Sequence, residues 1–523
     1  MNPRDIQLNI RKAKKMQIKV ICLREEKDKI KNLLEDTNKL IFVDDIKEIN
    51  SRDCILLSSF LVAKVCKKID LSKNNNLYLY TNDKIIDTNN TDQLLALRKK
   101  ALDKSDFSLA KSINKILIDI DFIKKNTLPL SSPTYLQIES TSYCNTECIM
   151  CSHYYNKNKL AKYLTTDTLN KCQDAIKLSY EISLNGMGEP FISPFISDQI
   201  DFYASFGNRI VTNTNLSYLN ARLLSQIDEN CDWLEISIDG ADKKTYEAIR
   251  KNLKFENLLE NLSKLQAKSP NLRKHIASVI MRQNVRQMPE MVKFAKKYHA
   301  NIITFMTLNS NLIIDNQRDE MSNYPKVLAY YSNLALEMGD KLGIDVVVPN
   351  SQKIDRNISY EDIKNDLEKM DSYPYYKSEE DYQKMMDISL IINKYLENND
   401  EIQRDTQKSK VKCQGICDWM LNSSYIDLDG NVAMCCRNQS FHLGNVNYEG
   451  SFKKVWQGKF AQKIREIFYS GYLPESCLKC GLIESGNLKY LTVDINESFY
   501  QDPSYKIKQK AILNELIKNE RIL

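Results

Sequence analysis

Residues 134–151, TYLQIESTSYCNTECIMC, join a short apolar segment typical of a β-strand to a loop that carries three cysteines. Cys144, Cys148 and Cys151 have the spacing C-x3-C-x2-C, and His153 follows two residues later. Three thiolates and an imidazole can complete a tetrahedral structural zinc site. The same three thiolates can instead hold a 4Fe–4S cluster and leave one iron without a protein ligand. Taken alone, the loop leaves both interpretations open.

The composition indicates a globular protein. The chain has 523 residues, 42% of them apolar, and a net charge of +6 from 74 basic and 68 acidic residues, which gives no strong attraction to nucleic acid or anionic membrane. The N-terminal residues lack the apolar core of a signal peptide, and the most apolar run, residues 54–66, is shorter than the roughly 20 residues of a membrane span. We therefore expect a cytoplasmic protein that binds neither membrane nor nucleic acid.

The cysteines fall into groups. In a reducing compartment, clustered cysteines indicate metal or redox chemistry rather than disulfide bonds. Of the 14 cysteines, nine belong either to the loop or to a second group between residues 413 and 480. The other five are predicted to be small buried residues; they are Cys22, Cys54, Cys66, Cys172 and Cys231.

Short apolar segments alternate with predicted helices from residue 134 onward. Because parallel strands joined by helical crossovers wind with one hand, this alternation predicts an α/β barrel or part of one. The predicted strands are residues 134–141, 180–186, 208–215, 233–240, 275–284 and 301–309, with a further edge strand at 343–350.

Polar and glycine-rich segments follow these predicted strands where each strand ends. In a parallel barrel, ligands bind at the carboxyl ends of the strands. Each segment alone is an ordinary turn or helix cap. Together with the cysteine loop they predict one shared site on one rim. The segments are GMGEP (186–190), TNTN (212–215), SIDG (237–240) and RQN (282–284).

The GMGEP turn distinguishes the two interpretations of the cysteine loop. Gly186 and Gly188 let backbone carbonyls approach an ammonium group, and Glu189 offers a carboxylate. A small molecule with an amine and a carboxylate can chelate the open iron of a cluster. A structural zinc ion needs no such turn opposite it. The cluster is therefore the favoured interpretation, with His153 as an ordinary loop residue.

The C-x3-C-x2-C loop after the first strand and the GGEP-like turn after the second resemble the radical S-adenosylmethionine (SAM) superfamily over residues 134–310. The resemblance implies a partial (β/α)6 TIM-like barrel and a 4Fe–4S cluster held by Cys144, Cys148 and Cys151. It also implies reductive cleavage of SAM to a 5′-deoxyadenosyl radical, which removes a substrate hydrogen. The superfamily usually has GGEP at this turn, whereas this chain has GMGEP, with Met187 before the second glycine. The side chain at that place is usually secondary, so the difference does not change these expectations. The residues implied to contact SAM are Met150 at the adenine, Gly186, Met187, Gly188 and Glu189 at the methionine amine, and Asn213, Ser237 and Asp239 near the ribose or carboxylate.

The second cysteine group contains a predicted hairpin at residues 417–436, with its turn at Asp429-Gly430, and the pair CLKC at 477–480. In isolation this pattern suits a zinc ribbon. After the barrel, residues 413–482 resemble the SPASM domain, which implies one auxiliary 4Fe–4S cluster. Cys435 and Cys436 are adjacent on a predicted strand, so their side chains are expected on opposite faces. The ligands implied are Cys417, Cys435, Cys477 and Cys480, with Cys413 and Cys436 left out.

The resemblance also suggests what the protein does. We expect an enzyme that oxidises, or forms a bond in, a peptide or sugar-type substrate, with an electron donor such as flavodoxin or ferredoxin. No catalytic residue is predicted beyond those that hold the cluster and SAM. The alternative is a non-catalytic zinc protein that binds nucleic acid, which leaves the strand-end segments unexplained. The predicted domains are an N-terminal α/β accessory domain (1–130), the barrel (131–350), a helical linker (351–412), a SPASM-type domain (413–485) and a helical tail (486–523).

Overall fold

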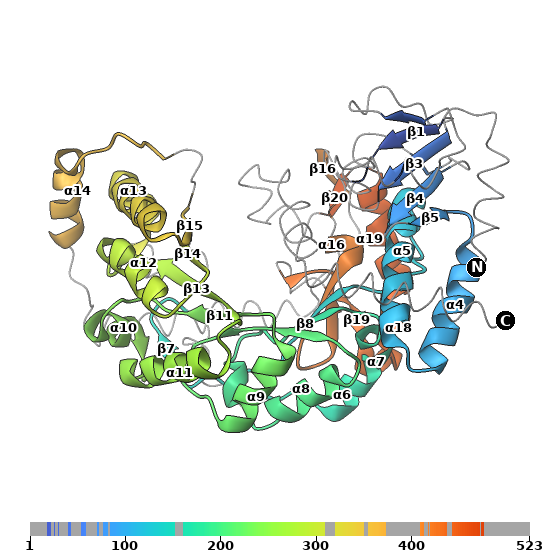
Figure 1. The fold of residues 1–523 in the computed structure, drawn as a ribbon, viewed down its shortest axis with the longest axis horizontal. Helices are drawn as coiled ribbons and strands as arrows, with labels where there is room; N and C mark the ends of the chain where they lie inside the picture. Colours follow the sequence, from blue (N-terminus) through green and yellow to red (C-terminus); the bar gives the residue numbers. More distant parts are fainter. Residues whose placement is uncertain are drawn as a thin grey trace. The chain divides into compact units, whose positions relative to one another are not determined.

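In the computed structural model of the protein, the chain forms two compact units. The first unit comprises residues 1–137, 166–180 and 402–523, and the second comprises residues 138–165 and 181–401. Each unit is described by itself (Figure 1). The structure describes residues 84–151, 161–308, 319–349, 354–372, 419–436 and 442–470, together with residues 408–412, 417, 472–474 and short segments between residues 18 and 81.

The first unit contains a five-stranded sheet with the order β2-β1-β3-β4-β5. Its first four strands are parallel, and β5 returns antiparallel to β4. β3 is the central strand, and its residues Ile55 and Leu57 are fully buried. The apolar run at residues 54–66 therefore begins with a buried strand. The strands are β1 (Ile18–Ile21), β2 (Leu40–Phe42), β3 (Cys54–Ser58), β4 (Leu77–Thr81) and β5 (Lys84–Asp87), followed by helices α4 (Thr91–Asp103) and α5 (Phe107–Lys124).

The second unit is built on parallel strands. β8 pairs with β9, and β10, β11, β13, β14 and β15 follow as parallel neighbours. This order confirms the predicted partial TIM-like barrel, including the edge strand near residue 345. The strands are β8 (Glu181–Ser183), β9 (Arg209–Val211), β10 (Asn213–Thr214), β11 (Trp233–Ser237), β13 (Arg273–Ile280), β14 (Ile302–Thr307) and β15 (Asp345–Val347).

Helices cover one face of this sheet (Figure 1). The hydroxyl of Ser278 on β13 lies 3.8 Å from the sulfur of Met291 on α12, so this face of β13 points toward the helix. Ile276 and Ile280 share that face and are buried. The helices are α8 (Ile196–Ala204), α9 (Ala221–Asn230), α10 (Lys243–Ile249), α11 (Phe255–Lys268), α12 (Met288–Lys297), α13 (Pro325–Leu342) and α14 (Tyr360–Ser372).

The C-terminal part of the first unit contains the predicted hairpin. β17 (Ser423–Ile426) and β18 (Asn431–Ala433) are antiparallel, and Gly430 between them has the positive φ of +83° that the turn requires. The sheet order continues as β19-β18-β17-β6. The remaining described elements are β6 (Tyr135–Ile138), α6 (Thr166–Lys171), α7 (Gln173–Ile176), β16 (Lys408–Lys412), α16 (Trp419–Asn422), β19 (His442–Asn445), α17 (Val446–Glu449), α18 (Phe452–Trp456), α19 (Lys459–Tyr469) and β20 (Tyr472–Pro474).

Two details of the predicted hairpin are wrong. Residues 419–422 form helix α16 instead of the start of a strand, and the hydroxyl of Ser423 accordingly donates back to the carbonyl of Trp419 at 3.1 Å. The return strand ends at Ala433, so Cys435 and Cys436 lie beyond it. The alternation of faces along a strand therefore does not apply to these two cysteines.

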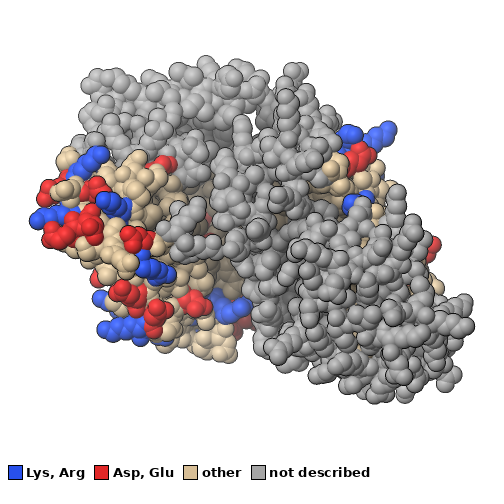
Figure 2. Space-filling view, turned by 90° about the horizontal axis from the view of Figure 1, so that it is seen from above, with Lys and Arg blue, Asp and Glu red and all other residues tan. Residues whose placement is uncertain are grey.

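Charges of both signs are mixed on the described part of the surface seen in Figure 2. Among the described helices, none combines the length and apolar character needed to cross a membrane.

Of the isolated cysteines, Cys172 and Cys231 are buried as predicted, whereas the side chains of Cys22, Cys54 and Cys66 lie outside the described residues.

Candidate functional site

The three-cysteine loop is fixed by the segment that follows helix α10. The short strand β7 (Glu147–Cys148) pairs antiparallel with β12 (Arg250–Lys251), and the Ile149 N–H donates to the Ile249 carbonyl at 3.0 Å. The loop then closes on itself, because the Cys151 N–H donates to the Cys148 carbonyl at 3.1 Å. Cysteines at both ends of this bend are therefore presented by ordered backbone.

The three thiols lie within electrostatic reach of one another. Burial raises the pKa of the Cys144 thiol to about 12, and the neighbouring Cys148 and Cys151 add to that rise. Burial likewise raises the pKa of Cys148, which is 5% exposed. Within the described part of the chain, no three Cys, His, Asp or Glu side chains gather around a point as they would for a single metal ion. His153, the fourth ligand of the zinc alternative, lies outside the described residues.

The GMGEP turn packs directly on the cysteine loop. The Gly188 N–H donates to the Thr141 carbonyl at 3.2 Å, and the Glu189 N–H donates to the Tyr143 carbonyl at 2.9 Å. A Cβ atom on Gly188 would lie 2.4 Å from both of these carbonyl oxygens, closer than real Cβ contacts come. Glycine is therefore required at position 188 by the approach of the two backbone segments.

Glu139 is a site residue that the sequence interpretation did not identify. It follows strand β6, is 5% exposed, and its Oε1 accepts a hydrogen bond from the Met187 N–H at 2.5 Å. A Cβ atom on Gly186 would lie 2.1 Å from Cγ of Glu139, so this glycine also permits a close approach. The available signal was an ionisable residue near the end of a predicted apolar strand, at the rim where the site was expected.

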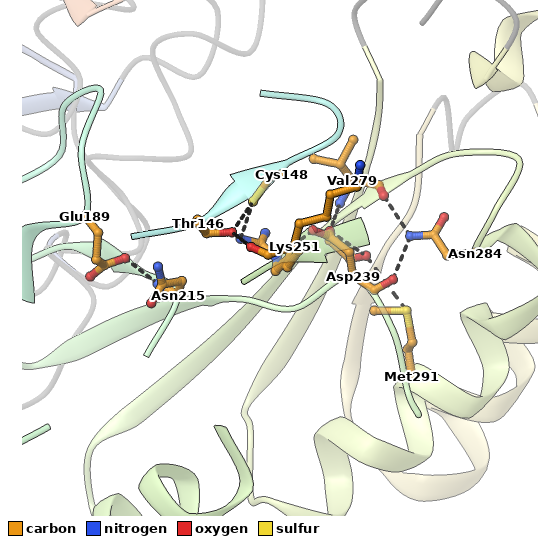
Figure 3. Close-up of polar contacts among 11 residues, drawn as sticks. Thr146, Cys148, Glu189, Asn215, Asp239, Lys251, Val279, Asn284 and Met291 are labelled. Atoms are coloured by element: carbon orange, nitrogen blue, oxygen red, sulfur yellow. Dashed lines mark hydrogen bonds and ion pairs between the residues drawn. The ribbon is translucent and has the colours of Figure 1, made fainter. Parts of the chain in front are cut away.

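The carboxylate of Glu189 is held by the chain. Its Oε1 accepts hydrogen bonds from the Thr214 hydroxyl at 2.6 Å and the Phe191 N–H at 3.2 Å, and its Oε2 accepts one from the Asn215 N–H at 2.7 Å. Burial raises its pKa above the ordinary range, and these donors oppose the rise. In Figure 3, Glu189 and Asn215 point toward each other. Glu189 thus joins the GMGEP turn to the end of β10.

Asparagines connect the other strand ends. Asn213, which was predicted near SAM, exchanges hydrogen bonds with Asn185: its N–H donates to Asn185 Oδ1 at 2.5 Å, and its Oδ1 accepts from Asn185 Nδ2 at 2.9 Å. Asn215 Nδ2 donates to Asn145 Oδ1 at 3.0 Å, and Asn145 Nδ2 donates to the Ser217 hydroxyl at 2.9 Å. The segment after β10 is therefore tied to the cysteine loop.

Asp239 and Arg250 form a buried ion pair beside the loop. Arg250 Nε lies 2.7 Å from Asp239 Oδ2, and Arg250 Nη1 donates to Cys148 Sγ at 3.7 Å. Asp239 is fully buried, and its Oδ1 accepts from the Val279 N–H at 2.8 Å. Figure 3 shows Asp239 beside Val279 and Asn284. Arg250 was not identified from the sequence, because a lone arginine after a helix carries no spacing signal.

The remaining predicted residues are placed as follows. Met150 is half-buried and packs against a buried cluster of Ile249, Met281 and Leu308. Ser237 ends β11 and is half-buried. Their predicted contacts with SAM, like those of Asn213 and Asp239, stay predictions.

The second cysteine group is only partly described. Cys417, Cys435 and Cys436 are each partly exposed. Trp419, just after Cys417, makes an edge-to-face contact with Tyr135, with ring centroids 6.1 Å apart. Cys413, Cys477 and Cys480 lie outside the described residues, so the predicted choice of ligands stays a prediction.

Comparison with known proteins identifies both cysteine regions. Residues 138–295 match the radical SAM superfamily, and residues 417–481 match SPASM, an iron–sulfur cluster-binding domain. Among solved structures, the chain is similar to Streptococcus suis SuiB bound to S-adenosylmethionine (14% identity, 68% of this chain and 69% of that chain, TM-score 0.42). It is also similar to anSMEcpe with bound AdoMet (14%, 68% and 88%, TM-score 0.43) and to BtrN in complex with AdoMet and 2-DOIA (11%, 65% and 88%, TM-score 0.32). No curated protein matches the sequence.

The two domains imply SAM, the 4Fe–4S cluster that binds it, and an auxiliary 4Fe–4S cluster as cofactors. The residues present fit the first cluster: three neighbouring thiols share one loop, a buried guanidinium lies beside Cys148, and the GMGEP turn is anchored to the same loop. Thiolates are the ligands that iron–sulfur clusters take, and a nearby cation offsets their charge. The chain therefore contains a radical SAM domain at residues 138–295 and a SPASM domain at residues 417–481.

Proposed function

We propose that this chain is an enzyme that binds SAM at the three-cysteine loop, cleaves it reductively, and uses the product radical to remove a hydrogen atom from a substrate. One observation carries the proposal. The cysteine loop and the GMGEP turn are hydrogen-bonded to each other through Thr141 and Tyr143, so a cluster on Cys144, Cys148 and Cys151 and a SAM-binding turn would share one site. The bound cluster would supply the electron that cleaves SAM.

The GMGEP turn would hold the methionine part of SAM. Gly186 and Met187 are exposed, so the backbone of this half of the turn can accept hydrogen bonds from an ammonium group. Gly188 and Glu189 face the protein and fix the turn. Glu189 would therefore act by positioning the turn, since its carboxylate oxygens already accept three hydrogen bonds from the chain.

We propose a peptide or sugar-type substrate with a polar group near the reacting carbon. On the face of the barrel sheet opposite the helices, His275 Nδ1 lies 2.9 Å from Glu235 Oε2, and His275 Nε2 lies 2.8 Å from the Thr304 hydroxyl. These three side chains are half-buried and come from neighbouring strands β11, β13 and β14. A hydrogen-bonding row of this kind suits hydroxyl or amine groups of a substrate. An auxiliary cluster would assist an oxidation or bond formation, and a flavodoxin or ferredoxin would supply electrons.

Anaerobically reconstituted protein tests the proposal directly. With dithionite and SAM, we expect brown protein that forms 5′-deoxyadenosine, slowly when no substrate is added, as measured by liquid chromatography. SAM binding by calorimetry provides a second measurement that does not depend on turnover. Protein that carries iron but neither binds nor cleaves SAM would refute the proposed activity. Colourless protein that takes up zinc and not iron would support the zinc alternative.

A further inference from the structure

Arg250 is a buried cation in contact with a cysteine of the three-cysteine loop. Its Nη1 lies 3.7 Å from Cys148 Sγ, and its Nε lies 2.7 Å from Asp239 Oδ2. The exposed fractions of Arg250, Cys148 and Asp239 are 7%, 5% and 0%. An isolated buried charge is costly, and Asp239 offsets the charge of the guanidinium. The ion pair with Asp239 already balances the charge of Arg250, so the additional contact of Arg250 with a cysteine sulfur needs a separate explanation.

Backbone pairing determines the position of Arg250. Strands β7 and β12 are antiparallel, with Arg250 directly opposite Cys148 and Lys251 opposite Glu147. Directly opposite residues on antiparallel strands project to the same face, with Cβ atoms about 4.5–5.5 Å apart. The guanidinium is therefore delivered to the side of the sulfur by strand register, and Asp239 holds it there from the end of β11.

Thr146 is the other described polar neighbour of this sulfur. Its Oγ1 lies 3.3 Å from Cys148 Sγ and 2.9 Å from the Lys251 carbonyl oxygen (Figure 3). A hydroxyl has one hydrogen, so a Thr146 that donates to Lys251 cannot also donate to the sulfur. A cluster-bound Cys148 is a thiolate and can only accept hydrogen bonds. Among these described neighbours, Arg250 is then the donor to the sulfur and the nearest positive charge.

We propose that Arg250 raises the reduction potential of the cluster held by Cys144, Cys148 and Cys151. This inference rests on the proposed function. Reduction adds one electron, supplied by dithionite or an electron-transfer protein, to a cluster whose thiolate ligands are already anionic. A fixed cation that donates to a ligand sulfur stabilises the reduced state more than the oxidised state. Asp239 keeps the guanidinium in place when the cluster changes charge.

The test is a redox titration of anaerobic, reconstituted full-length protein followed by electron paramagnetic resonance. The signal to follow is the one that changes when SAM is added, which separates this cluster from the auxiliary one. Arg250→Met keeps a long apolar side chain but removes the donor and the charge. At a fixed potential we expect the ratio of reduced to oxidised cluster to fall about tenfold, which is 59 mV for a one-electron couple. Arg250→Lys retains the charge without the forked geometry, and we expect a smaller fall.

Two further variants make the result decisive. Arg222→Met removes the same charge from an exposed ion pair with Asp198 on helices α8 and α9, and should leave the potential unchanged. Arg250→Met combined with Asp239→Asn leaves no unpaired buried charge, so it provides a folded protein if the single variant unfolds. Because loss of the Asp239 carboxylate raises the potential by itself, the double variant is compared with Asp239→Asn, and its potential should lie below that of Asp239→Asn. Equal potentials in these two variants, with the cluster present, overturn the inference and leave the proposed function intact. Failure of the wild-type protein to bind a SAM-responsive cluster would instead count against the proposed function itself.

Discussion

The chain holds its two cysteine groups in different ways. The loop at residues 144–151 is hydrogen-bonded to segments from other parts of the barrel, through Ile249, Asn215 and the strand pairing of Cys148 with Arg250. The described cysteines of the second group, Cys417, Cys435 and Cys436, lie just outside the hairpin β17–β18 instead. In the first case the cysteines belong to the barrel rim, and in the second they lie beside a small hairpin scaffold.

The scaffold of the second group is nevertheless well ordered. Asp427 Oδ1 accepts hydrogen bonds from the Asp429 and Asn431 N–H groups, each at 2.9 Å, and Asn447 Nδ2 donates to the Asp429 carbonyl at 2.9 Å. Next to the hairpin, Arg465 stacks on Trp456, with the guanidinium 4.4 Å from the ring centroid. The two groups therefore differ in what holds them. The first is hydrogen-bonded to the surrounding barrel, and the second lies beside a hairpin that is held by its own hydrogen bonds.

Removing a loop cysteine should have the largest effect. We expect Cys148→Ala to abolish formation of 5′-deoxyadenosine and SAM-responsive iron while the protein still folds, because the cluster loses one of three ligands. Cys144→Ala and Cys151→Ala should behave alike. The matched control is Cys172→Ala, a buried cysteine outside both groups, which should keep its iron and activity. Normal product formation by all three loop variants would show that the loop is not the cluster site.

The second group should lose its own cluster selectively. In protein that lacks the three loop cysteines, we expect serine variants at Cys417, Cys435, Cys477 and Cys480 to lose the remaining iron. Serine at Cys413 or Cys436 should leave it. Iron analysis and Mössbauer spectroscopy measure the outcome. Cys435 and Cys436 both lie beyond the end of β18, so strand geometry does not distinguish them. The choice between them therefore tests only the predicted spacing of the ligand from Gly430. Iron loss confined to Cys413 and Cys436 would shift the predicted ligand set.

A substitution in the GMGEP turn should separate the cofactor from the cluster. Gly188→Val would drive a branched side chain into the Thr141 and Tyr143 carbonyl oxygens, so the turn must move away from the cysteine loop. We expect SAM to bind about tenfold more weakly, with the iron content unchanged. Glu189→Gln should weaken binding less, since an amide oxygen still accepts part of the hydrogen bonding. Calorimetric titration with SAM measures both; equal affinity in wild type and Gly188→Val would show that the turn does not contact SAM.

The smallest expected effect concerns the hairpin turn. Gly430 has φ +83°, and an added Cβ would lie 2.6 Å from Asn447 Nδ2. We expect Gly430→Ala to lower the free energy of unfolding by about 2 kcal/mol through backbone conformation and this contact. Gly343→Ala is the matched control, because Gly343 also has a left-handed backbone (φ +61°) but nothing within 4 Å of its Cβ. Its cost should be about 1 kcal/mol. Equal losses in thermal or denaturant melts would mean that the Asn447 contact adds nothing.

Much of the fold follows from local sequence patterns. The alternation of apolar strands with helices predicted the parallel order of the second unit, and the Asp429-Gly430 pair predicted the hairpin turn. The prediction failed at residues 419–422, which form a helix although their apolar residues suit a strand equally well. Short apolar runs do not distinguish the two structures, because both bury the same side chains and only the surroundings select one.

The sequence by itself indicated the cofactors of this protein, because the spacing of Cys144, Cys148 and Cys151 and the GMGEP turn are properties of neighbouring residues. Only the tertiary structure decided which side chains contact these two segments. Glu139 reaches Met187 across 48 positions of the chain, and Arg250 reaches Cys148 across 102. Such partners are brought together by strand order and register, which depend on the packing of the whole barrel. Their roles therefore appear in the folded molecule and in no single stretch of its sequence.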